Sequence, residues 1–122
     1  MCHQTVSLVA RTLEENGIAT VVIGSAKDIV EHCGVARFLF TDFPLGNPCG
    51  RPDDLKSQQL VMTAALTMLD ETTVPGTTVQ TPLAWDDHGK WKTDFMHVGD
   101  GNRADLLAAG DRRRAEQAAA RT

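Results

Sequence analysis

The sequence predicts an α/β fold, a small three-layer domain in which helices cover both faces of a parallel sheet. Residues 18–24 and 36–43 are apolar runs rich in β-branched or large side chains, as buried strands are. Helical patterns alternate with these runs, in an order typical of parallel sheets. A sheet of three such strands is thin, because parallel sheets normally bury both faces and protect their edges. We therefore expect a second subunit to supply missing strands of the sheet.

Two helices are predicted in the first third of the chain. Residues 5–16 carry apolar side chains at helical spacing, and Gly17 supplies a C-terminal stop. Ser25 is expected to cap a second helix over residues 26–33, which Gly34 ends. The apolar positions of the first helix are Val6, Val9, Ala10 and Leu13.

A loop, a long helix and a third strand are predicted next. Residues 44–54 hold three prolines and two glycines and are therefore loop. Asp53 or Asp54 caps the following helix, which has enough apolar positions to be covered on more than one side. One stripe comprises Leu55, Gln59, Met62, Leu66 and Leu69, and Val61, Ala65 and Met68 widen it. Residues 76–82 form a third strand, expected at an edge because Pro82 closes it.

The character of the chain changes after residue 82, so we expect an α/β domain over residues 1–82 and a separate arm over residues 83–122. Trp85 and Trp91 flank an HGK turn, which indicates an irregular hairpin or an arm that wraps a neighbour. The final residues, DRRRAEQAAART, are helix-prone but weakly apolar, and they predict a solvated helix.

Composition excludes several classes of protein. A length of 122 residues suits one domain, and 42% hydrophobic residues is typical of a globular one. A net charge of −4 argues against a nucleic-acid binder, which is usually basic. No apolar run reaches the roughly 20 residues of a membrane span, and no signal peptide is visible. We therefore expect a cytoplasmic protein that binds neither nucleic acid nor membrane.

Cys2 is the first candidate for chemistry. If the first predicted helix begins near His3 to Thr5, Cys2 lies at or next to its N-cap, where unpaired backbone N–H groups and the helix dipole favour an anion. A thiol placed there is present to a greater extent as thiolate, which is the nucleophilic form. His3 is expected to act as a proton carrier and Gln4 as a hydrogen-bond donor beside it.

The proline-rich loop is the second candidate, as the wall of a substrate site. It follows a strand, and α/β sheets bind ligands at the carboxyl ends of their strands. Its prolines stiffen the backbone, and its glycines allow close approach. The expected substrate-binding residues are Pro44, Leu45, Gly46, Asn47, Pro48 and Cys49. Cys49 is in addition a candidate resolving thiol for Cys2.

Two further groups are weaker candidates. Cys33 sits late in an apolar-faced segment and is interpreted as a small buried hydrophobe. An acidic and histidine-containing group allows the alternative of a metal-binding module, although its spacing matches no motif with known mechanics. Its members are Asp86, Asp87, His88, His97 and Asp100. We therefore assign no metal site.

Two stretches together resemble a known family. They are CHQTVSLVARTLEENGI (2–18) and FPLGNPCGRPDD (43–54), in this order and with a strand between them. They resemble the carboxy-terminal part of the selenoprotein B family, the substrate-specific subunits of glycine, sarcosine and betaine reductases, with relatives in D-proline reductase. The resemblance covers residues 2 to about 82. In that family a redox-active selenocysteine or cysteine opens a helix, and a loop resembling PHPLGNP follows.

The resemblance can be carried over residue by residue. Cys2 falls on the selenocysteine position of the family, and Thr5 falls on the second cysteine that often accompanies it. Phe43 occupies the position of the histidine in the loop. A dithiol mechanism within this helix, and any role of that histidine, therefore do not carry over. The large amino-terminal portion of the family has no counterpart here, so we expect one half of a split enzyme or a stand-alone remnant.

The resemblance implies an oxidoreductase that cleaves a carbon–heteroatom bond reductively. The chalcogen anion attacks a small-molecule substrate at a carbon that bears a nitrogen or similar leaving group. Some members work beside a second subunit that carries a pyruvoyl group. We expect no cofactor in this chain, and a pyruvoyl group or a redox thiol donor on a partner. A non-catalytic assembly subunit of such a complex is the alternative.

Overall fold

The computed structural model describes residues 2–120. The chain divides into two compact units, Met1–Lys92 and Thr93–Thr122. The first unit contains α1 (Cys2–Glu15), β1 (Val22–Gly24), α2 (Lys27–Cys33), β2 (Arg37–Phe40), α3 (Leu55–Glu71) and β3 (Thr77–Gln80). The helix α4 (Lys90–Asp94) spans the division, and the second unit contains α5 (Arg103–Ala120). The sequence-based boundary after residue 82 stays a prediction.

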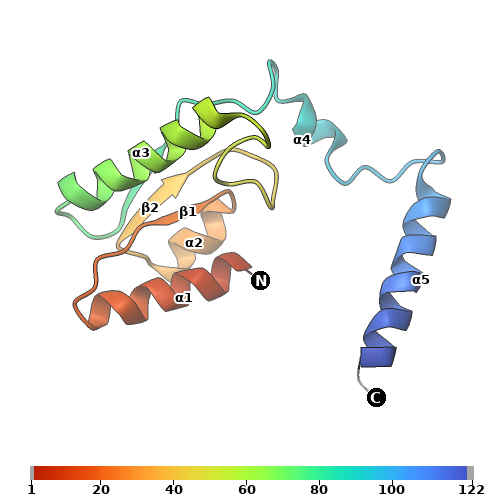
Figure 1. Cartoon of the computed structure of the whole chain (residues 1–122), viewed down its shortest axis with the longest axis horizontal. Helices are drawn as coiled ribbons and strands as arrows, with labels where there is room; N and C mark the ends of the chain where they lie inside the picture. The colour runs from red at the N-terminus through yellow and green to blue at the C-terminus, as the bar shows by residue number, and fades with distance from the viewer. Residues whose placement is uncertain (1, 121–122) are drawn as a thin grey trace. The chain divides into compact units, whose positions relative to one another are not determined.

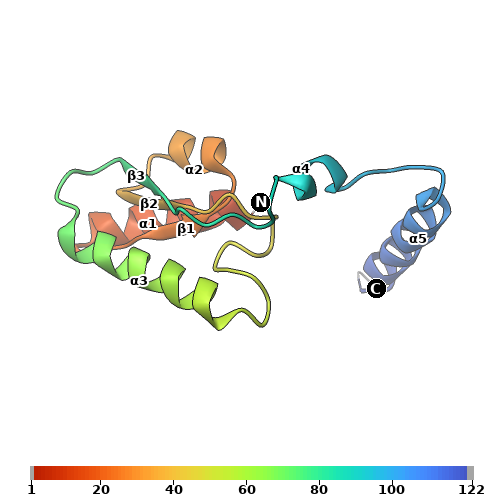
Figure 2. The same ribbon diagram turned by 90° about the horizontal axis from the view of Figure 1, so that it is seen from above.

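The three strands form one parallel sheet in the order β1-β2-β3; Figure 1 labels β1 and β2, and Figure 2 labels all three strands. Val22 of β1 lies opposite Phe38 of β2, and Arg37 of β2 lies opposite Thr77 of β3. The predicted α/β class with a small parallel sheet is therefore confirmed. Within the described residues β3 is an edge strand, as its closing proline indicated, and β1 is the other edge.

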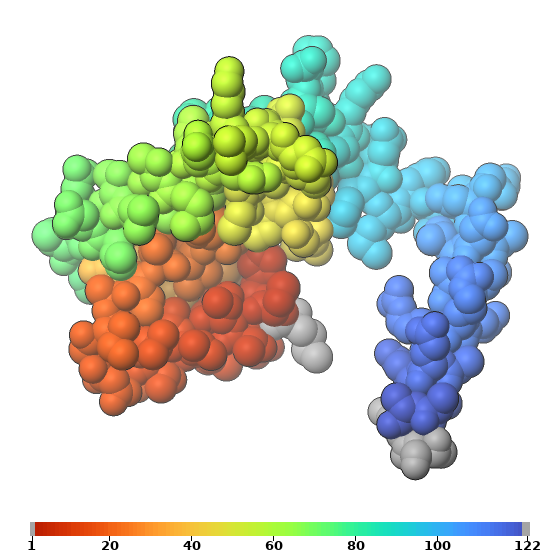
Figure 3. Space-filling model, viewed as in Figure 1, coloured from red at the N-terminus to blue at the C-terminus, as the bar shows by residue number. Residues whose placement is uncertain are grey.

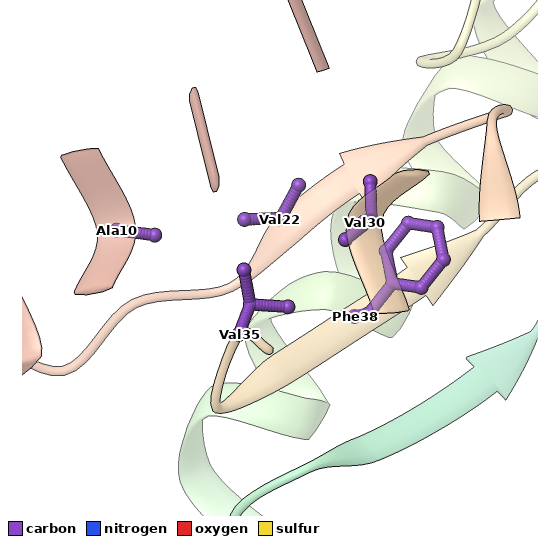
Figure 4. Close-up of a cluster of buried hydrophobic side chains, with 5 residues drawn as sticks. All are labelled: Ala10, Val22, Val30, Val35 and Phe38. Carbon is purple, nitrogen blue, oxygen red and sulfur yellow. The ribbon is translucent and has the colours of Figure 1, made fainter. Parts of the chain in front are cut away.

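Helices cover both faces of the sheet, as Figures 1 and 2 show. Successive side chains of a strand point to opposite faces of the sheet, so Phe38 lies on one face and Leu39 on the other. The α1 and α2 face holds the cluster of Figure 4, which comprises Ala10, Val22, Val30, Val35 and Phe38. The α3 face holds Leu39, Phe43, Val61, Ala65 and Met68. The core is therefore two thin clusters separated by the sheet.

The two crossovers of the sheet differ in hand. The strands follow one another in space as in sequence, but the connecting helices α2 and α3 lie on opposite faces. One crossover is consequently left-handed, an exception to the usual rule for parallel strands. The loop before α3, residues 41–54, gives the chain the length to reach the second face.

The buried face of α1 differs from the predicted one. The helix begins at Cys2, earlier than predicted, and buries His3, Ser7 and Ala10. The predicted apolar positions Val6, Val9 and Leu13 are instead exposed by 45%, 51% and 36%. Two polar side chains take the place of apolar ones because hydrogen bonds satisfy them, since Ser7 donates to the backbone oxygen of His3 at 2.6 Å.

The long helix α3 is covered on one side. Asp54, one of the two predicted candidates, caps it, because its carboxylate accepts the backbone N–H of Ser57 at 3.2 Å. The buried positions are Ser57, Val61, Ala65 and Met68. Leu55, Met62 and Leu66 are exposed by 66%, 47% and 60%, so the prediction of covering on more than one side is wrong within this chain. Figure 3 shows both α1, in red to orange, and α3, in green, at the molecular surface.

The two ends of α2 differ in how well the sequence predicted them. Ala26 precedes α2 and no side chain caps that helix, so the prediction of Ser25 as its cap is wrong. Gly34 ends α2 in the left-handed conformation with φ 74°, as predicted.

Between residue 81 and residue 120 the structure describes helices and irregular chain with no strand, so the hairpin alternative is wrong. No described helix combines the length and apolarity needed to cross a membrane.

Candidate functional site

The first turn of α1 lies at the edge of the sheet where the strands end (Figure 2). His3 establishes this placement, because its Nε2 accepts the backbone N–H groups of Ser25 at 3.1 Å and Ala26 at 3.3 Å. Both residues follow β1 directly. Ligands of α/β domains bind at this carboxyl edge, so the start of α1 is in the expected place for a site.

Cys2 presents an exposed thiol at this edge. It is the first residue of α1, where backbone N–H groups have no partner inside the helix and the helix dipole favours negative charge. Its Sγ lies 3.6 Å from Nδ1 of His3. Cys2 and His3, two of the three residues predicted to be catalytic, are thus brought together.

The imidazole of His3 is held in a closely packed position. The residue is 8% exposed. A Cβ at Gly24 would lie 2.9 Å from Cδ2 of His3, closer than side chains tolerate, so a glycine is required at the end of β1. In the sequence Gly24 reads only as the boundary of a strand. Its steric role depends on a residue 21 positions earlier, which no local pattern reveals.

The proline-rich loop joins the same edge through Thr41. The backbone N–H of this buried residue donates to the oxygen of Gly24 at 2.9 Å, beside His3. Its hydroxyl donates to the backbone oxygen of Pro48 at 2.7 Å. The loop and the first turn of α1 are therefore connected through the end of β1. Thr41 is a residue that sequence reasoning missed, because it reads as an ordinary strand residue.

The far end of the loop is fixed against α3. Gly50 has φ 125°, and a Cβ there would lie 2.9 Å from the backbone nitrogen of Gln58. The N–H of Arg51 donates to the hydroxyl of Ser57 at 3.1 Å. Among the predicted substrate-binding residues Pro44 is buried, Asn47 and Pro48 are half-buried, and Leu45, Gly46 and Cys49 are exposed. The loop is thus anchored at both ends and open between them.

The three cysteines are free thiols in different surroundings. Cys2 and Cys49 are exposed, whereas Cys33 is half-buried and less enclosed than predicted. The third predicted catalytic residue, Gln4, lines a groove of about 360 Å³ between α1 and α2, together with His32 and Cys33. Gln4 therefore faces α2.

A second hollow lies at the carboxyl ends of β2 and β3. It has a volume of about 340 Å³. Lys92 forms an ion pair with Asp42 at its rim, and the carboxylate of Asp86 accepts the backbone N–H of Trp91 at 2.8 Å. Its lining comprises Asp42, residues 80–86, Gly89, Trp91 and Lys92. Sequence reasoning noted the tryptophans here but did not predict a cavity.

The part of the chain that the structure describes holds no group of three or more His, Cys, Asp or Glu side chains placed to bind a metal ion. The alternative of a metal-binding module therefore has no cluster in residues 2–120 to support it.

Comparison with known proteins finds similarity to a reductase subunit. The chain is 31% identical over 84 residues to the gamma subunit of D-proline reductase from Acetoanaerobium sticklandii. The match takes in 69% of this chain and 35% of that subunit, so the chain spans about a third of its relative. No family model matches, and no solved structure matches. The expected relation to a reductase of this group is confirmed at the level of homology, and the selenoprotein B family itself stays a prediction.

Proposed function

We propose that this chain is the small subunit of a heteromeric reductase related to D-proline reductase, with the Cys2 thiolate as its nucleophile. The observation that carries the proposal is the exposed Cys2 at the first residue of α1, at the carboxyl edge of the sheet. Homology to a D-proline reductase subunit gives the class of reaction. A reducing cytoplasm would keep Cys2 as a thiol.

The reaction is the reductive cleavage of a carbon–nitrogen or similar bond in a small molecule. The sulfur of Cys2 bonds to the carbon, and the leaving nitrogen takes the electron pair of the broken bond and a proton. A second thiolate then attacks the sulfur of Cys2, and the carbon departs with the electron pair and takes a proton. The disulfide that results is reduced by a dithiol donor on the partner. Cys49, exposed on the loop, is a candidate for the second thiolate.

The substrate is proposed to bind against the open part of the proline-rich loop. Leu45 and Gly46 are exposed there, between two anchored ends. Anchoring fixes the wall of a site before the substrate arrives, which reduces the entropy cost of binding. The loop itself is tied to the end of β1, where His3 also makes its hydrogen bonds.

A partner subunit is proposed to cover the outer edge of β1. Within the described residues that edge pairs with no strand, and unpaired edges of parallel sheets are normally protected. Exposed apolar side chains extend over the helices on both faces, including Val9 of α1 and Leu66 of α3. The relative is about three times as long as the matched part of this chain, so it contains further sequence outside the match.

The test is turnover by the assembled complex. The chain is co-expressed with the product of the neighbouring gene and assayed with D-proline as probe and a dithiol as reductant. Cys2→Ser is expected to lower turnover at least about a thousandfold without loss of assembly, because the nucleophile is absent. Cys33→Ser is the matched control and should lower stability more than turnover. Full activity of Cys2→Ser would overturn the proposal.

A non-catalytic assembly subunit is the second candidate, and the exposed apolar stripe on α3 favours it. In that case Cys2→Ser remains active, whereas Leu66→Lys prevents assembly. Val74→Lys is the matched control, because Val74 is as exposed as the stripe but lies outside α1 and α3. Loss of assembly in Leu66→Lys alone, together with full turnover in Cys2→Ser, would establish this alternative.

A further inference from the structure

We propose that His3 serves Cys2 as a fixed hydrogen-bond donor and not as a general base. The inference rests on the proposed role of Cys2, and it assigns to His3 a task different from the proton carrier that the sequence suggested. It depends on which ring nitrogen of His3 carries the proton, and the turn after β1 determines that.

The backbone of the turn leaves Nε2 of His3 without a proton. Nε2 receives two N–H groups, from Ser25 at 3.1 Å and from Ala26 at 3.3 Å. Backbone N–H groups only donate, so Nε2 must present its lone pair to them. A neutral imidazole has one N–H, which is then on Nδ1. The hydrogen-bond network thus selects the Nδ1–H tautomer.

That proton is directed at the sulfur of Cys2. Nδ1 lies 3.6 Å from Sγ, within the range of a hydrogen bond to sulfur. An N–H donor stabilises a thiolate more than a thiol, because a hydrogen bond to a charged acceptor is the stronger one. Nδ1 already holds a proton and has no lone pair in the ring plane to accept another. The proton of Cys2 therefore leaves to solvent or to a group on the substrate or partner.

The surroundings of His3 oppose a 180° flip of the ring, which would exchange the positions of its nitrogens and carbons. Cδ2 and Nε2 both lie close to Gly24, where a Cβ would be 2.9 and 3.1 Å from them. The hydroxyl of Ser7 holds the backbone oxygen of His3 at 2.6 Å. A flipped ring would place carbon against the two half-buried N–H groups of the turn and leave both without this acceptor, which costs free energy.

The direct test is the tautomer of His3 in the isolated chain, measured by two-bond ¹H–¹⁵N correlation spectroscopy near pH 7.5. The expected spectrum shows a protonated Nδ1 and an unprotonated Nε2. The other three histidines, His32, His88 and His97, serve as references in the same spectrum. A spectrum with the proton of His3 on Nε2 would overturn the inference. Neither result depends on turnover, so the proposed function can fail or stand separately.

Two substitutions test the consequence for Cys2. His3→Asn can keep an amide N–H near the position of Nδ1, whereas His3→Gln places its amide near Nε2. The readout is the alkylation rate of Cys2 by iodoacetamide at pH 7, with Cys49 as control in the same molecule. We expect His3→Gln to lower the alkylation rate of Cys2 about tenfold, because a hydrogen bond to the thiolate is lost. His3→Asn should lower that rate less than about threefold.

The dependence on pH separates a lost donor from a structural defect. Above about pH 9, where most thiols ionise without help, His3→Gln should recover most of its alkylation rate. An equal loss in both variants at pH 7 would contradict the donor role, as would no loss in either. Gly24→Ala adds an independent variant, because the added Cβ displaces the ring and should slow Cys2 without altering Cys49.

Discussion

The two ends of α1 are tied to the sheet in a similar way but leave different groups available. At the carboxyl edge His3 accepts two backbone N–H groups from the turn after β1. At the opposite edge Glu14 accepts the backbone N–H of Thr20 at 2.6 Å, just before β1, and pairs with Arg37 of β2 at 2.9 Å. In each case a side chain of α1 accepts hydrogen bonds from backbone N–H groups next to one end of β1.

The two ends of α1 differ in the groups that lie next to these hydrogen bonds. Arg37 also donates to the backbone oxygens of Thr20 at 3.4 Å and Thr72 at 3.3 Å, so the half-buried side chain of Glu14 belongs to a network of protein groups. Beside His3 lies the exposed sulfur of Cys2. The amino edge is therefore expected to contribute stability, whereas the carboxyl edge presents the proposed nucleophile. Substitutions at the two edges should therefore separate stability from thiol reactivity.

The largest effect is expected from Arg37→Met. The substitution leaves the Glu14 carboxylate without its cation and two backbone oxygens without a donor, in a half-buried place. The free energy of unfolding should fall by about 2–3 kcal/mol. Arg11→Met is the control, because Arg11 is exposed and donates to the backbone oxygen of Cys33, so its loss should cost under about 1 kcal/mol. Urea unfolding measures both. A slower alkylation of Cys2 in Arg37→Met would break the proposed separation.

A smaller loss is expected from Glu14→Gln. The amide oxygen can still accept the N–H of Thr20, but the ion pair with Arg37 is lost. We expect the free energy of unfolding at pH 7 to fall by about 1–2 kcal/mol. Urea unfolding of Glu15→Gln gives the matched control, since Glu15 is exposed and adjacent. Equal stability of the two variants would show that the network at Glu14 contributes nothing.

The cap of α3 should contribute about as much as a typical helix cap. Asp54→Ala removes the acceptor of the Ser57 N–H and should cost about 1 kcal/mol. Asp53→Ala, at a residue with φ 58° that does not cap the helix, is the companion variant. Thermal unfolding compares them, and the Cys2 alkylation rate should be unchanged in Asp54→Ala. A change in that rate would mean that the loop transmits strain to the carboxyl edge.

Stability should also depend on acid pH through Glu14. The backbone N–H of Thr20 is the largest cause that holds the pKa of Glu14 below its ordinary value of 4.5, and Arg37 lowers it further, while burial acts the other way. The contribution of Glu14 is therefore complete above about pH 4.5 and is lost as the pH falls through the lower folded pKa. Urea unfolding between pH 7 and pH 3 should show the gap between wild type and Glu14→Gln closing. A constant gap would contradict this linkage.

Local signals in the sequence predicted the elements well. Gly34 and Asp54 mark helix ends whose conformations depend on neighbouring residues only, and both predictions are confirmed. The α/β class is confirmed too, because the alternation of strands and helices suffices to indicate it. Cys2 at a helix start follows from the same local pattern.

Local signals could not predict which faces of the helices are buried, nor the long-range contacts of His3 at the candidate site. Burial of His3 and Ser7 in place of Val6 depends on hydrogen bonds and close packing that no periodicity contains. His3 finds its two N–H donors 22 and 23 positions away. The exposure of Leu66 reflects surface that this chain alone does not cover. Long-range contacts account for the burial of His3 and Ser7, and Leu66 belongs to the surface that the proposed partner would cover.

The central claim is that Cys2 is a reactive nucleophile, and the most direct measurement is the alkylation rate of each cysteine in the folded chain. Mass spectrometry after brief treatment with iodoacetamide at pH 7 gives the three rates in one sample. The account predicts that Cys2 reacts faster than Cys49, although both are exposed, and much faster than Cys33. In concentrated urea the three rates should converge. A folded chain in which Cys2 reacts no faster than Cys49 would contradict the account.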